Sequence, residues 1–253
     1  MANIFIKVPN YKYTSKLINK DIVFFNLVDL NIKIPTKFIS SYNNLKKDNY
    51  IINNLNTNRF RKFRNYKIYV KNRNDNSPFE IHLLNNNYFK QNVPDNRGHI
   101  RKYEIIDDTF CQSDWMLQLI TNFCEISLYN KCKQDKCFYN SICADISVHQ
   151  VRQLCNVNNK SFNSPEGIHK DGADWIVSAL VLNKINTKGG KSNIYDKTKS
   201  KIDSKNLNIN EGIFMNDTNY YHDVTPIECL DNNFIGIRDI LGIDIKFTDF
   251  DTK

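Results

Sequence analysis

The 253-residue chain lacks any apolar run that approaches the roughly 20 residues needed to cross a bilayer. Its first residues, MANIFIKVPNYKYTSK, also lack the basic, then apolar, then small-residue order of a secretion signal. We therefore expect a cytoplasmic protein with no membrane partner. Hydrophobic residues make up 41% of the chain and charged residues 25%, which favours a packed core over global disorder.

Tight Cys-x-x-Cys pairs are also missing, although the chain has seven cysteines. Zinc sites are typically built from such closely spaced pairs. Four cysteines fall near one another without that spacing, namely Cys124, Cys132, Cys137 and Cys143. The spacing therefore favours reduced thiols over a zinc centre.

Acidic residues are fewer than basic ones. Lys and Arg total 35 against 27 Asp and Glu, which gives a net charge of +8. Such an excess suits an acidic partner, and nucleic acid is the first to consider. The positive charges are scattered among Asn and Tyr and form no stripe, so the sequence gives little support for a nucleic-acid partner. A nucleic-acid demethylase stays a minor alternative.

The expected elements place most of the β structure in the second half. Residues 114–129 (DWMLQLITNFCEISLY) carry apolar side chains at helical spacing. From residue 144, short β-branched and aromatic runs alternate with turn residues, as is typical of an antiparallel barrel or jelly roll. We expect a single domain over 1–253, mainly β with flanking helices. It comprises a mixed region over 1–143 and a β core over 144–253, and its oligomeric state stays open.

A His-x-Asp motif in this β region carries candidate metal ligands. His169 and Asp171 would face the same side if they lay on a strand. His222 follows 51 residues later in another expected strand, and a jelly roll brings distant strands side by side. Two imidazoles and one carboxylate form the facial triad of non-haem Fe(II) oxygenases, with positions left open for a cosubstrate and O₂. The alternatives are a chance His-x-Asp and a solvated His222-Asp223 pair.

Arg238 is a lone charge in the apolar run FIGIRDILGIDI, 16 residues past His222. Burying an unpaired guanidinium is costly, so we expect it to have an anionic partner. A planar fork of donors suits a carboxylate, and 2-oxoglutarate has a distal one. A carboxylate of the chain itself, such as Asp239, is the alternative partner.

The sequence segments around these positions resemble the bacterial 2-oxoglutarate/Fe(II) dioxygenase family that contains L-isoleucine dioxygenase. The resemblance is strong in blocks over 144–247 and weaker over 55–110. The blocks are His149-Gln150-Val151-Arg152, Ser164-Pro165-Glu166-Gly167-Ile168-His169-Lys170-Asp171-Gly172-Ala173-Asp174, Gly189-Gly190, Tyr221-His222-Asp223-Val224-Thr225-Pro226 and Ile237-Arg238-Asp239-Ile240-Leu241.

This resemblance implies a cupin-like double-stranded β-helix that hydroxylates an unactivated C–H bond of a free L-amino acid, with release of succinate and CO₂. The implied cofactors are Fe(II), 2-oxoglutarate as cosubstrate, and O₂. By the resemblance, His169, Asp171 and His222 bind Fe(II), and Arg238 binds the distal carboxylate of 2-oxoglutarate. Related halogenating enzymes lack the carboxylate, so Asp171 favours hydroxylation.

Strand alternation adds candidate substrate residues. Gln150 and Arg152 share one face of their strand, and Arg152 is a candidate for a substrate or cosubstrate carboxylate. An outward-facing Arg152 is the alternative. Arg59 and Arg61 have the same parity and could reach across the mouth of the fold. Asp174 is a candidate for a substrate ammonium, although the chain differs in length by one residue from its relatives near this position.

Other readings of the same residues stay open. A 2-oxoglutarate oxygenase could act on a protein side chain or a natural product, because the amino-acid substrate rests on the resemblance alone. A non-catalytic jelly-roll binding module with a degenerate metal site is a second alternative. The intact ligand set argues against that module.

Overall fold

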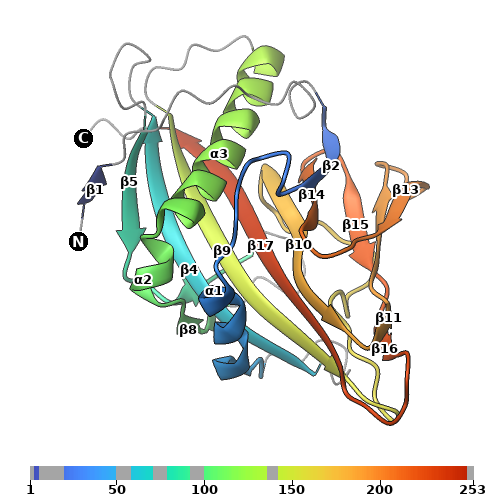
Figure 1. Cartoon of the computed structure of the whole chain (residues 1–253). Helices are drawn as coiled ribbons and strands as arrows, with labels where there is room; N and C mark the ends of the chain where they lie inside the picture. Colours follow the sequence, from blue (N-terminus) through green and yellow to red (C-terminus); the bar gives the residue numbers. More distant parts are fainter. Residues whose placement is uncertain are drawn as a thin grey trace.

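The computed structural model describes residues 3–5, 20–49, 58–70, 79–91, 100–135 and 142–249. A large, mainly antiparallel sheet runs through the molecule in the order β1-β5-β4-β9-β17-β10-β14-β2, with β3 and β8 beside β4 (Figure 1). Its strands are β1 (Asn3–Phe5), β2 (Ile22–Asn26), β3 (Lys46–Lys47), β4 (Arg59–Val70), β5 (Phe79–Leu84), β8 (Glu104–Ile105), β9 (Ile142–Cys155), β10 (Trp175–Ile185), β14 (Glu211–Asn216) and β17 (Gly236–Asp249).

Smaller sheets lie together beside the β10–β14 part of the large sheet (Figure 1). They comprise a three-stranded sheet in the order β13-β12-β15 and a β11-β16 pair, while a separate β6-β7 pair contacts β4 through Phe89 and Phe63. The mainly β, jelly-roll fold is therefore confirmed. These strands are β6 (Tyr88–Phe89), β7 (Arg101–Lys102), β11 (Thr187–Gly189), β12 (Lys191–Tyr195), β13 (Lys201–Asn206), β15 (Tyr221–Val224) and β16 (Ile227–Cys229).

Helices cover one face of the large sheet (Figure 1). They are α1 (Thr36–Ser40), the 3-10 helix η1 (Ser41–Asn44), α2 (Asp108–Cys111) and α3 (Asp114–Asp135). The helix expected over 114–129 is confirmed and continues to Asp135. Its Phe123 packs against Phe25 of β2 and Phe214 of β14, with ring centroids 4.9 and 5.0 Å apart. Because the main core lies between the helices and the sheet, the opposite face is left for a site.

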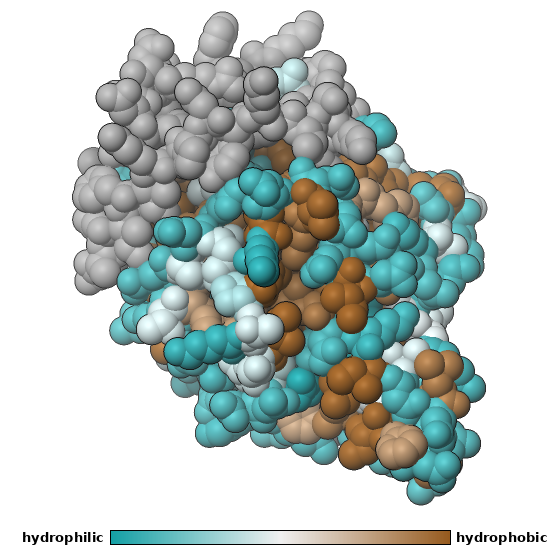
Figure 2. All heavy atoms as spheres, viewed as in Figure 1, coloured by the Kyte–Doolittle hydropathy of each residue, from teal (hydrophilic) through white to brown (hydrophobic). Residues whose placement is uncertain are grey.

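The large sheet takes strands from both halves of the sequence. β2 and β4, from the first half, pair with β14 and β9, which lie later in the chain. Hydrophilic residues cover much of the face shown in Figure 2, with apolar groups between them. No helix in the described ranges is both long and apolar enough to span a bilayer. The cysteine side chains that the structure describes are buried, namely Cys111, Cys124, Cys143, Cys155 and Cys229.

Candidate metal centre and cosubstrate pocket

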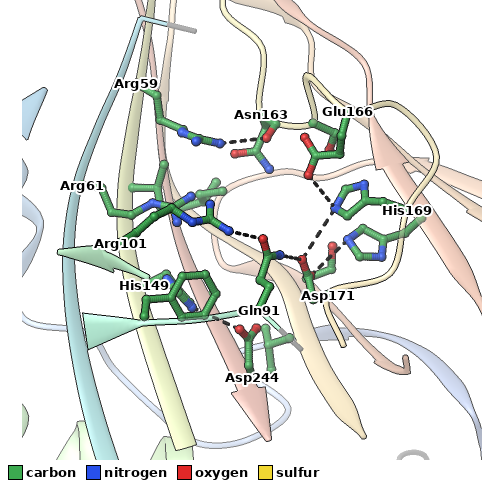
Figure 3. Close-up of a pocket in the computed structure, with 18 residues that line it drawn as sticks. Arg59, Arg61, Gln91, Arg101, His149, Asn163, Glu166, His169, Asp171 and Asp244 are labelled. Atoms are coloured by element: carbon green, nitrogen blue, oxygen red, sulfur yellow. Dashed lines mark hydrogen bonds and ion pairs between the residues drawn. The ribbon is translucent and has the colours of Figure 1, made fainter. Parts of the chain in front are cut away.

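The candidate site is a pocket between the helix-free face of the large sheet and a wall made by β15 and the segment that joins β9 to β10 (Figure 3). Strands β4, β9, β10 and β17 form one wall, and residues 163–171 with β15 form the other. The lining residues are Arg59, Arg61, Phe89, Gln91, Arg101, His149, Val151, Asn163, Ser164, Glu166, His169, Asp171, Val177, Ser178, His222, Ile240, Gly242 and Asp244.

Three potential metal donors converge in this pocket. His169, Asp171 and His222 each offer one ligand atom, and these atoms all lie within 4.8 Å of one another. Asp171 Oδ1 is 3.6 Å from His169 Nε2, and Asp171 Oδ2 is 3.4 Å from His222 Nε2. Two imidazoles and one carboxylate on one side of a shared point suit Fe(II), so the residues fit that metal.

The route by which these donors meet differs from the sequence expectation. His222 lies on β15 as expected, but His169 and Asp171 do not share a strand. Instead, His169 forms a single β-bridge to His222, with backbone N–H to O distances of 3.0 and 2.9 Å. Asp171 lies in the loop that follows. A bridge and a loop turn therefore bring the donors together, and strand alternation does not.

Neighbouring groups orient the donors. His169 Nδ1 is 2.8 Å from the Gly167 carbonyl, so this nitrogen donates a hydrogen bond and leaves Nε2 as the metal donor. Gln91 donates from Nε2 to Asp171 Oδ1 at 2.9 Å. Glu166 Oε1 lies 3.2 Å from His169 Nε2, which is the atom that a metal needs. A bound metal must therefore break the Glu166–His169 contact.

Charges set the protonation of the metal-free cluster. Burial lowers the pKa of His169, but the hydrogen bond and charge of Asp171, together with Glu166, outweigh it and raise that pKa to about 9. Burial raises the pKa of Asp171, yet its hydrogen bonds with the two histidines hold that pKa well below its usual value. An ion pair consequently occupies the centre until a metal replaces the imidazole proton.

Arg238 lies on the pocket side of β17, in the same parity as Ile240 and Gly242. Its side chain is 1% exposed, and no described carboxylate forms an ion pair with it. Nη1 donates to Gln153 Oε1 at 3.0 Å, whereas Arg238 Nη2 and Gln153 Nε2 are buried without a hydrogen-bond partner. Burial lowers the pKa of Arg238 to about 10. One unused donor on this buried cation and another on the neighbouring glutamine fit a carboxylate ligand.

Asp239 is not the partner of Arg238. It faces the other side of β17, where Arg152 Nε and Nη2 donate to its two oxygens at 2.6 and 2.8 Å. A Cβ added at Gly190, whose φ is +64°, would lie 3.2 Å from Arg238 Nε. The turn between β11 and β12 can therefore approach this guanidinium closely only with glycine at that position.

The structure places three of the sequence candidates outside the pocket. Arg152 is committed to Asp239, and Gln150 Nε2 donates to Ser41 Oγ at 2.8 Å on the side of η1. The pocket side of β9 belongs to His149 and Val151, so the expectation chose the wrong face of this strand. Asp174 also does not line the pocket, contrary to the expectation of a substrate contact. Its carboxylate accepts a hydrogen bond from the Phe247 backbone N at 2.7 Å and anchors the loop to β17.

Arg59 and Arg61 do line the pocket. Arg59 uses its donors within the protein, because Nε and Nη2 lie 2.9 and 2.8 Å from Asp48 and Nη1 donates to the Asn163 carbonyl at 3.1 Å. Arg61 stacks over Tyr103, 5.1 Å from the ring centroid, and its Nε has no hydrogen bond but lies 3.6 Å from Asp48 Oδ2 in a longer ion pair than that of Arg59. Arg61 is therefore the better placed of the two to meet a ligand.

Several pocket residues were missed from the sequence. His149 Nε2 lies 3.1 Å from Asp244 Oδ2, and Arg101 Nη2 donates to Gln91 Oε1. Asp244 carried a usable signal, since it shares the parity of Arg238 on β17. Gln91 and Arg101 flank a turn-rich segment without any such signal.

The fold and this site define an oxygenase of the jelly-roll class. The model of the 2OG-Fe dioxygenase family matches residues 39–244, so the chain belongs to this family. It is accordingly an oxidoreductase whose cofactors are Fe(II), 2-oxoglutarate and O₂. No sequence among curated proteins matches the chain.

Solved structures support the same fold. IDO from Bacillus thuringiensis is 20% identical with a TM-score of 0.71, over 91% of this chain and 95% of that one. A bsmA homologue from Methylobium petroleophilum PM1 is 16% identical with a TM-score of 0.75, over 90% and 89%. The Fe(II)/(alpha)ketoglutarate-dependent dioxygenase TqaL is 14% identical with a TM-score of 0.62, over 92% and 84%.

Proposed function

We propose that this protein hydroxylates an unactivated C–H bond of a free L-amino acid, with release of succinate and CO₂. In this proposal His169, Asp171 and His222 hold Fe(II), and Arg238 binds the distal carboxylate of 2-oxoglutarate. The observation that carries it is the convergence of the three donors in a pocket whose walls also bear charges of both signs.

The bound iron, with 2-oxoglutarate and O₂, supplies the oxidising chemistry that side chains lack. The protein supplies position and charge. Three protein ligands leave coordination positions open on the iron. Because one of these ligands is the carboxylate of Asp171, the site supports hydroxylation over halogenation. Arg238 and Gln153 offer two unused buried donors, which orient the cosubstrate by its far end.

The pocket walls match a zwitterion. Arg61 and Arg101 bring positive charge to one wall, while Glu166 and Asp244 bring negative charge elsewhere in the pocket (Figure 3). Apolar surface comes from Phe89, Val151, Val177 and Ile240. The cavity volume is about 80 Å³, which favours a small ligand over a bulky one. An α-carboxylate, an ammonium and an apolar side chain would each find a counterpart.

The test is a product assay with the iron-loaded protein. We expect 2-oxoglutarate and one or more free amino acids to give succinate and a product heavier by one oxygen atom in mass spectrometry. The same amino acid within a short peptide is the matched control and should stay unmodified. Oxidation of the peptide alone would refute the amino-acid substrate.

Two variants separate the parts of the proposal. Asp171→Ala should abolish hydroxylation without added formate or chloride, and full activity in this variant would remove Asp171 from the ligand set.

Arg61→Gln should raise the KM for the amino acid about tenfold or more, because a charge-assisted hydrogen bond contributes about 1.5–3 kcal/mol. The KM for 2-oxoglutarate should change little, and equal changes in both constants would argue against the assignment.

A further inference from the structure

A buried carboxylate lies directly behind the candidate metal centre. Asp217 follows the last residue of β14, and its side chain is 1% exposed. Among the described residues no lysine or arginine forms an ion pair with it, and the imidazole of His222 lies 3.9 Å from its Oδ1. Burying a carboxylate without a cation is unfavourable unless hydrogen bonds satisfy its oxygens. The donors that bond to the Asp217 carboxylate therefore show which part of the chain this residue holds in place.

The bonds come from the loop that carries a metal ligand. Asp217 Oδ1 accepts from the backbone N of Asp171 at 3.1 Å, and Oδ2 accepts from Gly172 and Ala173 at 2.7 and 3.2 Å. Gly172 has a φ of +84°, which turns successive N–H groups toward one anion. The Asp217 backbone N also donates to the Asp174 carbonyl at 3.0 Å. Asp217 consequently clamps the loop from Asp171 to Asp174.

The same carboxylate faces a second ligand. Asp217 Oδ1 lies 3.9 Å from His222 Nδ1, which is buried and has no hydrogen bond. A metal-bound histidine normally donates from its outer nitrogen to a carboxylate, a carbonyl or water. His169 already has such a partner in Gly167. One buried side chain therefore touches the backbone of Asp171 and stands on the outer side of His222.

We propose that Asp217 is a positioning residue that holds Asp171 and His222 in metal-binding geometry before the metal arrives. The inference rests on the proposed function of His169, Asp171 and His222 as ligands. Without this carboxylate, three backbone donors lose their acceptor and the Asp171 side chain is no longer held toward the imidazoles. Metal affinity then falls even though every ligand is present.

Mn(II) titration by calorimetry, without O₂ or substrate, tests this role. Asp217→Asn should raise the Kd for Mn(II) about 10- to 100-fold, the usual loss when an outer partner of a ligand is removed. Asp196→Asn is the matched control. Its carboxylate also accepts backbone N–H groups, from Thr198 and Ser200 at 2.8 and 3.0 Å, but in the turn between β12 and β13. The Asp196→Asn Kd should stay within about twofold of wild type, because no metal ligand contacts it.

His169→Ala in the same titration separates the two proposals. An unchanged Kd in this variant would show that the proposed metal site itself is wrong. A weakened His169→Ala with an unchanged Asp217→Asn would overturn the positioning role and leave the metal site standing. A lower melting temperature of Asp217→Asn with an unchanged Kd would overturn it as well.

Hydrogen exchange on the wild-type protein keeps the proposal testable if Asp217→Asn does not fold. The backbone amides of Gly172 and Ala173 should exchange slowly in the metal-free protein, and Mn(II) should change their rates little. Protection of these amides that develops only after Mn(II) is added would show that the loop is not preorganised, and it would overturn the inference.

Discussion

At the scale of single residues, two arginines on neighbouring strands have opposite relations to carboxylates. Arg152 of β9 shares two hydrogen bonds with Asp239, which is fully buried. Arg238 of β17 is also buried, with 1% of its surface exposed, but its side-chain hydrogen-bond partner is the neutral Gln153. A buried charge pair stabilises the fold when complete, whereas an unpaired buried charge destabilises it. Arg152 therefore serves the fold, whereas Arg238 is available for the carboxylate ligand that we propose.

Arg238→Met should raise the KM for 2-oxoglutarate by about 100-fold, since losing one partner of a buried charge pair costs about 2–5 kcal/mol. The KM for the amino acid should change much less. Because the variant removes an unpaired buried charge, the melting temperature of the metal-free protein should not fall. Steady-state kinetics and thermal unfolding check both statements, and a parallel rise in both KM values would contradict the assignment.

Arg152→Met is the matched control. It leaves the Asp239 carboxylate buried with Asn183 as its remaining partner. The free energy of unfolding should fall by about 3 kcal/mol, while the KM for 2-oxoglutarate stays within a fewfold of wild type. A large effect on this KM would return Arg152 to the cosubstrate site.

His169, as a proposed metal ligand, would make metal binding depend on pH. Its pKa is raised to about 9 in the metal-free protein, above the value of about 6.5 for an unfolded histidine. The protonated imidazole therefore stabilises the metal-free fold fully below about pH 6.5, and this contribution is lost as the pH rises through about 9. Metal binding must displace that proton. Apparent Mn(II) affinity should rise about tenfold per pH unit between pH 6.5 and 8.5.

Calorimetric titrations in buffers of different ionisation enthalpy would also count the proton released. Glu166→Gln removes one of the charges that raise the pKa of His169, so the pH dependence should level off at a lower pH. An affinity that does not change between pH 6.5 and 8.5 would contradict the protonated state assigned to His169.

At the scale of elements, α3 supports the sheet from the side opposite the pocket. Its Phe123 is fully buried between aromatic rings of β2 and β14. β14 ends at Asn216, immediately before Asp217, and β2 pairs with β14 over five residues. The helix therefore supports the candidate metal centre indirectly, because it packs against β14, the strand that is followed by Asp217.

Phe123→Ala should lower the free energy of unfolding by about 3–5 kcal/mol, because it leaves a cavity in a core that cannot fully close. Urea denaturation measures this change. Tyr129→Ala, on the same helix but 37% exposed, is the control and should cost much less. Similar losses in the two variants would show that α3 packs differently from the described arrangement.

At the scale of the whole molecule, the site joins parts of the chain that are distant in sequence. Arg59 and Arg61 of β4 face His169 and His222 across one pocket. A ligand that bridges these walls binds the folded chain and not the unfolded one, so it stabilises the entire fold.

Mn(II) at 100 times its Kd should add about 2.7 kcal/mol to the stability. For a chain of this size, that corresponds to a rise of about 5–10 °C in melting temperature. Adding 2-oxoglutarate should raise the melting temperature further in wild type but not in Arg238→Met. A chelator should reverse the metal effect, and a melting temperature insensitive to Mn(II) would contradict a metal site.

Much of the fold followed from local patterns. The helical spacing of apolar residues over 114–129 and the short β runs after residue 144 each reflect a periodicity that neighbouring residues carry by themselves. The order of His169, Asp171, His222 and Arg238 was also visible, because residue type alone sets metal and carboxylate chemistry. These features needed no knowledge of distant contacts.

Only the tertiary structure decided which side chains share the pocket. A period of two shows which residues of β9 lie on one face, but not which face looks inward, and both faces of β9 are buried. Gln150 is buried on the side of the sheet that packs against η1, whereas His149 faces the pocket. The bridge of His169 to His222 and the clamp at Asp217 join residues about 50 positions apart. Such contacts depend on how the chain closes on itself, which local sequence does not encode.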